Sequence, residues 1–247
     1  MATPNPSDDA SRIREQVTRE LQLVFSDFYK GSAKEKLYRR NTERFAQQML
    51  KLGKTVSLLC KYPLISVIAL EDLRKYAGAP TDEVRAKLEA FQQVSHILNA
   101  FSYVAFVEAV ATPFIDMSIL LLSAEGFHFH VEPDREHIFI RHAMSLEDLE
   151  SPSISLGAKL NFLESCGITF FSKWIDKTLR NKIAHLDFEI EGNGDFVTTT
   201  SKENVVKKVK IDLLKKLNSF VNYNTAVSDV FTKTLGKAYP TSDTSSK

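Results

Sequence analysis

Apolar residues recur at intervals of three and four positions along much of the chain, a spacing that predicts amphipathic helices. The first predicted helix covers residues 8–30 and ends before Gly31, and its apolar stripe consists of Ile13, Val17, Leu21, Val24 and Phe28. A second predicted helix covers residues 32–60, and a shorter one follows Pro63 at residues 64–76. The N-terminal part of the chain is therefore predicted to be helical.

A long helical pattern covers residues 82–123, with Thr81 as its predicted N-cap and Pro113 as a predicted kink or break. Beyond Val94 this segment is apolar on several sides, which predicts a position at the centre of a bundle. Three more helices are predicted at residues 155–166, 169–185 and 209–235. The middle one of these would bury Phe170, Trp174, Ile175, Leu179 and Ile183.

Two segments change from helical spacing to the alternation that is typical of β-strands. The first is a predicted hairpin at residues 126–142, in which one face carries Phe127, Phe129, Ile138 and Ile140 and the other carries His128, His130, His137 and Arg141. The second is a predicted hairpin around the turn at residues 191–195. An acidic linker is predicted at residues 145–153.

Only nine Gly and eight Pro occur in 247 residues, which argues against a loop-rich sandwich or a glycine-rich nucleotide fold. The composition and the helical patterns together predict an all-α fold with two small β-hairpin insertions. We expect an N-terminal helical extension at residues 1–80, a helical bundle at 81–237 and a disordered tail at 238–247.

The chain carries 32 Lys and Arg against 31 Asp and Glu, so binding along a polyanion by overall charge is not expected. The charge is uneven, however, because residues 1–61 and 201–237 each carry a net +5 and residues 125–150 carry −5. Solvated helix faces are one explanation, and a local phosphate-binding rim is the other.

The two cysteines, Cys60 and Cys166, lie far apart and indicate neither a disulfide framework nor a cysteine zinc site, as expected in a reducing cytoplasm. The first residues lack the basic and apolar regions of a signal peptide. The most apolar stretch, residues 97–124, contains Glu108 and Asp116, which favours a core helix over a membrane span. The sequence thus predicts a cytoplasmic location and no membrane partner.

The segment that carries the most chemical information lies at the end of the predicted helix at residues 169–185. Arg180 and His185 stand five positions apart there, and they form the only R-x4-H match in the chain. Asn181 directly follows the arginine, the small Ala184 precedes the histidine, and another predicted helix follows the motif.

This combination resembles the HEPN superfamily, all-helical domains marked by an R-x(4–6)-H motif in which Asn often follows Arg. The resemblance implies a HEPN-like bundle over residues 82–237 that forms a homodimer and brings two motifs together in a cleft. It also implies a metal-independent endoribonuclease without a cofactor, in which Arg180 and His185 are catalytic and RNA is the substrate. Asn181, Lys182 and Asp187 would bind or orient the substrate. Members of the family include toxins with antitoxin partners and defence effectors, while others only bind RNA, nucleotide or a partner protein.

The residue types suit this chemistry. Histidine titrates near neutral pH and can transfer the protons of RNA cleavage, and arginine can hold a phosphate through two donors. Asn181 lies one turn before His185 and could orient the ring or contact phosphate. Arg180 lies about 140° around the helix from His185, so it must bend back or serve the site across the dimer.

Asp187 departs from the family branch that pairs with a nucleotidyltransferase, where a tyrosine stands two residues after the histidine. Tyrosine modification is therefore not expected, and Asp187 could orient His185 or cap the helix end. An ordinary structural role also accounts for the motif, with Asn181 and His185 bonded to the helix end and Arg180 in an ion pair.

The predicted hairpin offers a rival site. His128, His130 and His137 share one predicted face, and three imidazoles can bind zinc. A solvated strand face explains the same alternation, so no metal is expected.

Overall fold

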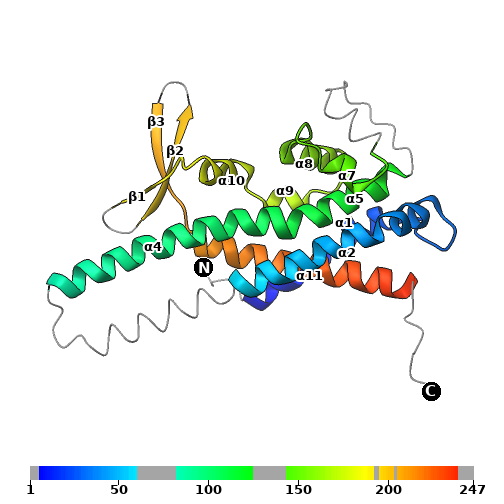
Figure 1. The fold of residues 1–247 in the computed structure, drawn as a ribbon, viewed down its shortest axis with the longest axis horizontal. Coiled ribbons are helices and arrows are strands. Elements are labelled where there is room, and N and C mark those ends of the chain that lie inside the picture. Colours follow the sequence, from blue (N-terminus) through cyan, green and yellow to red (C-terminus); the bar gives the residue numbers. More distant parts are fainter. Residues whose placement is uncertain (1–5, 60–81, 125–142, 192–194, 203–204, 239–247) are drawn as a thin grey trace, which may run out of the picture. The chain divides into compact units, whose positions relative to one another are not determined.

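The computed structural model describes residues 6–59, 82–124, 143–191, 195–202 and 205–238 (Figure 1). This part of the chain is mostly helical and contains a three-stranded antiparallel sheet, in agreement with the mainly helical fold expected from the sequence. The predicted hairpin at residues 126–142, the predicted helix at 64–76, Thr81 and nearly all of the predicted tail lie outside the described residues.

The chain divides into two units. The first is formed by residues 1–48, 111–175 and 219–247, and the second by residues 49–110 and 176–218. The predicted division into an extension at 1–80 and a bundle at 81–237 stays a prediction.

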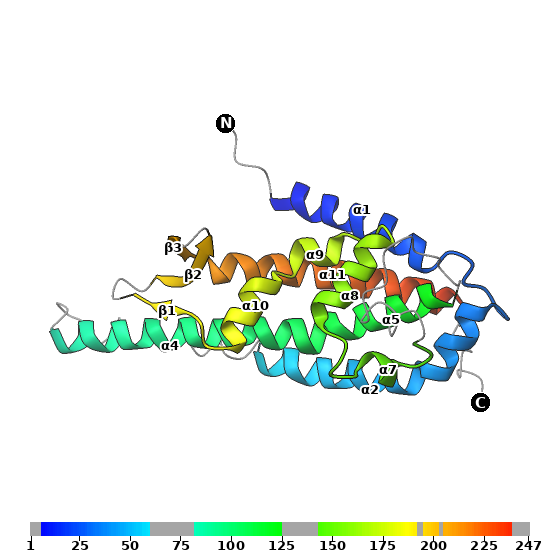
Figure 2. The ribbon, with the colours of Figure 1, turned by 90° about the horizontal axis from the view of Figure 1, so that it is seen from above.

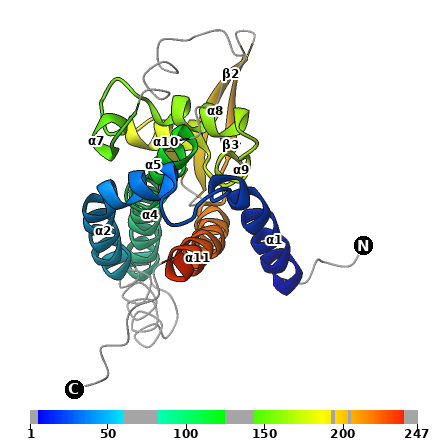
Figure 3. The same cartoon turned by 90° about the vertical axis from the view of Figure 1, so that its right-hand side faces the viewer.

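The first unit is a helical bundle. Its elements are α1 (Pro6–Val24), the first part of α2 (Ala33–Leu59), α5 (Thr112–Ser123), α7 (Leu146–Leu149), α8 (Leu156–Ser165), α9 (Phe170–Trp174) and most of α11 (Leu213–Ala238). Helix α5 is its centre, because every residue from Pro113 to Leu122 is buried. Phe45 of α2, Phe114 of α5 and Phe231 of α11 pack together with ring centroids 5.0 to 6.2 Å apart. Figures 2 and 3 show α11 lying between α1 and α2.

Buried polar side chains fix the ends of several helices in this unit. Glu20 accepts hydrogen bonds from the backbone N–H groups of Thr169 at 2.5 Å and Phe170 at 2.9 Å, which satisfies the N-terminus of α9. The Lys34 ammonium donates to the carbonyl of Val24 at 2.8 Å at the end of α1. Between α5 and α8, Lys159 and Asp116 form a buried ion pair at 2.8 Å.

The second unit combines helix α4 (Asp82–Phe106), helix α10 (Lys177–Ala184) and the sheet. Strands β1 (Glu189–Ile190), β2 (Phe196–Lys202) and β3 (Val205–Lys210) lie in the order β1-β2-β3, and both pairs are antiparallel. The pairing of β1 with β2 confirms the second predicted hairpin. Helix α4 is followed by a π-helical turn, η1 (Val107–Ala111), just before Pro113, so the predicted break is also confirmed.

Four boundaries predicted from the sequence are wrong. Helix α1 ends at Val24 rather than near residue 30, because Asp27 adopts a left-handed backbone with φ 56°. The acidic linker contains the helical turn α7, which Ser145 and Asp148 close with a capping box.

The other two corrections concern the starts of α10 and α11. The helix predicted at residues 169–185 is two helices, because Ile175 is extended and Asp176 starts a new helix by accepting from the N–H of Leu179. Residues 209 and 210 belong to strand β3 rather than to the last helix, which starts at Leu213 after Asp212 accepts from the N–H of Lys215. The five residues predicted to be buried at 169–185 are buried.

Among the described residues, the stretch Gln93–Ser123 is long and apolar enough to cross a membrane by length and composition. In its most apolar window 71% of the residues are buried inside the protein. A membrane-spanning helix would present that surface to lipid, so the burial favours the core helix that the sequence predicts.

Candidate functional site

The R-x4-H motif lies on α10 and at its C-terminal end. The helix is amphipathic, with Leu179 and Ile183 buried, and it packs against α4 (Figure 1). Arg180 lies on the half-buried side and His185 is the C-cap residue. The predicted position of His185 at a helix C-terminus is therefore confirmed.

The N-terminal end of α10 is fixed by Asp176. Its carboxylate accepts from the N–H of Leu179 at 2.9 Å and pairs with the Lys216 ammonium at 3.0 Å, while its own N–H donates to the Tyr103 hydroxyl at 2.9 Å. Burial alone would raise the pKa of Asp176, but the hydrogen bond from Leu179 and the ion pair with Lys216 outweigh it and hold that pKa below its usual value. Burial raises the pKa of Tyr103, so its phenol stays protonated.

Arg180 contacts a carboxylate that the sequence did not single out as a partner. Its Nε donates to Oε1 of Glu108 at 2.7 Å, and its Nη2 donates to the same oxygen. Its Nη1 donates to the side-chain oxygen of Asn181 at 2.9 Å. The arginine thus neither bends toward His185 nor lies free, but is held between the π-helical turn η1 and its own helix.

His185 is the exposed member of the motif. Its backbone N–H donates to the carbonyl of Asn181 at 2.9 Å, and Leu186 after it adopts a left-handed backbone with φ 58° that turns the chain out of the helix. Within the part of the chain that the structure describes, the imidazole has no hydrogen-bond or ion-pair partner. The ring is therefore open to solvent and to a ligand.

Lys182 and Asp187 contact each other rather than His185. The Lys182 ammonium donates to Oδ2 of Asp187 at 3.0 Å and to the carbonyl of Thr199 in β2, and the Thr199 hydroxyl approaches Oδ1 of Asp187 at 3.4 Å. The backbone N–H of Asp187 donates to the carbonyl of Lys182 at 2.7 Å. Of the two roles open to Asp187, the geometry matches closure of the helix end.

Sequence reasoning missed the residues that hold the motif in place, namely Glu108, Tyr103, Asp176 and Lys216. Glu108 had one visible signal, because it is one of only two acidic residues in the strongly apolar stretch 97–124. Asp176 had another, because Asp three residues before Leu179 is a typical N-cap spacing. The pairings themselves join residues that are distant in sequence. Arg180 lies 72 positions from Glu108. Asp176 lies 73 positions from Tyr103 and 40 from Lys216.

The described residues hold no group of three or more His, Cys, Asp or Glu side chains that could bind a metal ion. The alternative zinc ligands His128, His130 and His137 lie outside the described residues. Burial raises the pKa of the Cys166 thiol to about 12, so this residue is a poor nucleophile at neutral pH.

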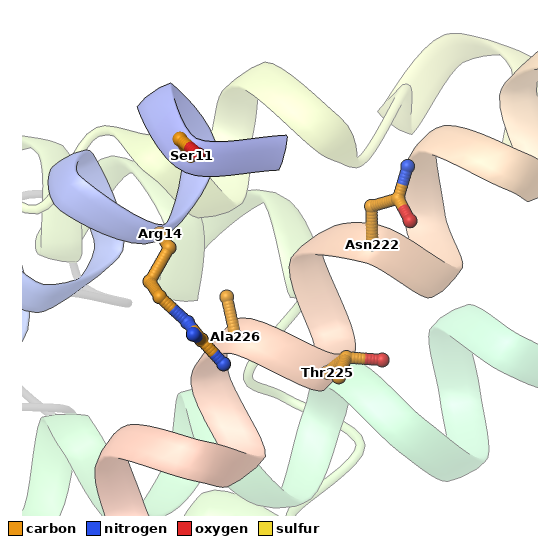
Figure 4. A pocket seen from close by; sticks show the side chains of 5 residues that line it. All are labelled: Ser11, Arg14, Asn222, Thr225 and Ala226. Atoms are coloured by element: carbon orange, nitrogen blue, oxygen red, sulfur yellow. The ribbon is translucent and has the colours of Figure 1, made fainter. Parts of the chain in front are cut away.

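A groove between α1 and α11 of the first unit holds two cavities of about 310 and 390 Å³. Arg14 lines both, and its guanidinium pairs with Asp229 at 3.0 Å. Figure 4 shows its side chain reaching from α1 toward Ala226 and Thr225. The hydrogen bond from Lys233, together with the charge of Arg14, lowers the pKa of Asp229. Among the described lining residues there is no imidazole or thiol, so the chemistry of the motif has no counterpart in this groove.

Compared with known proteins, the chain matches no family model, no curated protein and no solved structure.

Proposed function

We propose that the protein is a metal-independent endoribonuclease of the HEPN type, with Arg180 and His185 as its catalytic residues. The observation that carries this proposal is the state of His185, an exposed imidazole without a partner among the described residues. It stands at the end of a helix whose start is fixed by Asp176 and Tyr103. An imidazole that is open to solvent at the end of an anchored helix is suited to proton transfer.

The proposed reaction uses the RNA's own 2′-hydroxyl. His185 accepts the proton of this hydroxyl as its oxygen bonds to phosphorus, and the bond from phosphorus to the 5′-oxygen breaks. Arg180 stabilises the negative charge that builds up on the phosphate. His185 of a second copy gives a proton to the departing oxygen. The products are a 2′,3′-cyclic phosphate and a 5′-hydroxyl.

The proposal includes a homodimer, because one copy supplies one motif and the reaction uses two imidazoles. It further includes a cytoplasmic location and a role as a toxin or defence effector, with an antitoxin or another protein as partner. A HEPN-like fold of the described helices belongs to the same proposal.

A second candidate function is a HEPN module that binds RNA, nucleotide or a partner protein without cleaving it. The observation that favours it is the Glu108–Arg180 pair, because a catalytic arginine must be available to the phosphate. RNA binding without cleavage would select this function.

The test is cleavage of a mixed RNA pool in EDTA by the purified protein. We expect cutting by the wild type and a loss of at least about 100-fold in rate for both Arg180→Ala and His185→Ala, the usual scale of a lost acid or base. Equal cutting by all three proteins would indicate a contaminating nuclease and contradict the proposal.

Arg44→Ala is the matched control. Arg44 is an arginine of the first unit that donates to one carboxylate, Glu150, through Nε and Nη2, as Arg180 does with Glu108. We expect this variant to cut RNA as fast as the wild type.

A protein that stays monomeric at micromolar concentration in sedimentation experiments would count against the dimeric site.

A further inference from the structure

The Glu108–Arg180 pair occupies the part of the arginine that normally holds a phosphate. Nε and Nη2 form the edge of the guanidinium that binds two oxygens of a phosphate or carboxylate side by side. In this structure both donors meet a single oxygen, Oε1 of Glu108. A phosphate would offer one oxygen to each donor, so it matches this edge better than Glu108 does.

Glu108 comes from an unusual backbone. It lies in the π-helical turn η1, Val107–Ala111, between α4 and Pro113. Such turns are rare but frequent at functional sites. Glu108 therefore stands at a backbone irregularity of the kind that functional sites often contain.

The pair is also exposed enough to be exchanged. The side chain of Glu108 is 44% exposed and that of Arg180 is 27% exposed. Water solvates both charges at this exposure, so little is lost when a ligand replaces the carboxylate. The third contact of Arg180, from Nη1 to Asn181 at 2.9 Å, does not involve this edge and can persist with a ligand bound.

We propose that Glu108 takes the place of the substrate phosphate in the free protein and is displaced when RNA binds. The Glu108 carboxylate keeps Arg180 in position in the free protein and lowers the protein's affinity for RNA. This inference rests on the proposed function, because it takes Arg180 as the phosphate-binding residue. Glu108 does not react. It regulates access to the site, since RNA binds only when its phosphate replaces the carboxylate.

The test measures binding of a single-stranded RNA oligonucleotide with 2′-O-methyl groups at every position, which cannot be cleaved because the attacking hydroxyl is blocked. Glu108→Gln keeps the shape of the side chain and removes its charge. We expect its Kd to fall by about tenfold, the factor that follows if Glu108 occupies Arg180 in roughly nine free molecules of ten. Glu108→Ala should bind at least as tightly as Glu108→Gln.

Two controls make the effect specific. Glu150→Gln removes the carboxylate that Arg44 contacts in the first unit and should leave the Kd unchanged. The double variant Glu108→Gln/Arg180→Ala should bind no more tightly than Arg180→Ala alone, because the gain acts through the arginine. Thermal melting of each variant establishes that it is folded.

An unchanged or higher Kd for folded Glu108→Gln overturns the inference, and so does the absence of binding by every variant. The inference is also overturned if Glu108→Gln lowers the Kd as much in the Arg180→Ala background as in the wild type, since the effect would then be general charge removal. These outcomes are separate from the proposed catalysis. If Glu108→Gln tightens binding through Arg180 but no RNA is cleaved, the inference stands and the proposed endoribonuclease activity is wrong. If RNA is cleaved but Glu108→Gln leaves the Kd unchanged, the proposed activity stands and the inference is wrong.

Discussion

Two of the ion pairs that connect helical elements differ in burial. Lys159 and Asp116 connect α8 and α5 of the first unit with exposed fractions of 6% and 0%, whereas Arg180 and Glu108 of the second unit are 27% and 44% exposed. A buried charge that loses its partner cannot be solvated, but an exposed one can. The first pair is therefore a permanent part of the core, and the second is available to a ligand.

The largest effect is expected when one member of the buried pair is removed. Lys159→Met removes the ammonium that pairs with the buried carboxylate of Asp116 and should lower the free energy of unfolding by about 3–5 kcal/mol. Urea unfolding measures this loss. Lys173→Met, at an exposed lysine of α9, is the control with little expected change. A loss below about 1 kcal/mol for Lys159→Met would show that this pair resembles the exposed one.

The next effect concerns Glu20, whose carboxylate accepts two backbone hydrogen bonds at the start of α9. Glu20→Ala leaves these N–H groups without an acceptor and should cost about 1.5–3 kcal/mol. Glu15→Ala, at an exposed position of the same helix, serves as control in the same urea experiment. If the two variants unfold at the same urea concentration, Glu20 is not the anchor of α9.

Asp176 is the intermediate case, because it is half-buried and belongs to the motif helix. Asp176→Asn removes the ion pair with Lys216 and weakens the N-cap of α10, and we expect a loss of about 1 kcal/mol at neutral pH. The pKa of Asp176 is lowered in the folded protein, so its contribution is fully present above the unfolded pKa and disappears as pH falls through the folded value.

Urea unfolding at several pH values checks this. The difference between wild type and Asp176→Asn should be constant above about pH 5 and shrink below about pH 4. A difference that instead grows toward acid pH would mean that Asp176 is not stabilised in its charged form.

The smallest effect on stability is expected at the exposed pair itself. Glu108→Gln should change the free energy of unfolding by less than about 1 kcal/mol. Its Kd for the RNA oligonucleotide should nevertheless fall by about tenfold. A loss of stability as large as that of Lys159→Met would show that Glu108 is a structural anchor. The contrast drawn between the buried and the exposed ion pair would then be wrong.

The sequence predicts the elements of this protein better than their contacts. Helices α2 and α8 follow from uninterrupted apolar periodicity and from end signals such as Gly167, which has φ 84°. Strand β3 was missed because Val205, Val206 and Val209 fit either period, and pairing with β2 decides between them. The break at Ile175 was missed because apolar spacing continues across it.

The candidate site shows the same limit more sharply. Arg180 and His185 can be found from their spacing, but their surroundings cannot, because Glu108 and Tyr103 come from segments distant in sequence. Asp187 illustrates the point: its position two residues after His185 leaves both an orienting role and closure of the helix end open, and only the structure shows that its carboxylate contacts Lys182 and Thr199.

The most direct test of the central claim is the chemical nature of the ends that the protein leaves on a defined RNA in EDTA. The proposed reaction predicts that mass spectrometry finds 2′,3′-cyclic phosphate and 5′-hydroxyl ends with the wild type and with Arg44→Ala, and intact RNA with His185→Ala. Intact RNA with the wild type, or the same ends with His185→Ala at an undiminished rate, would contradict it.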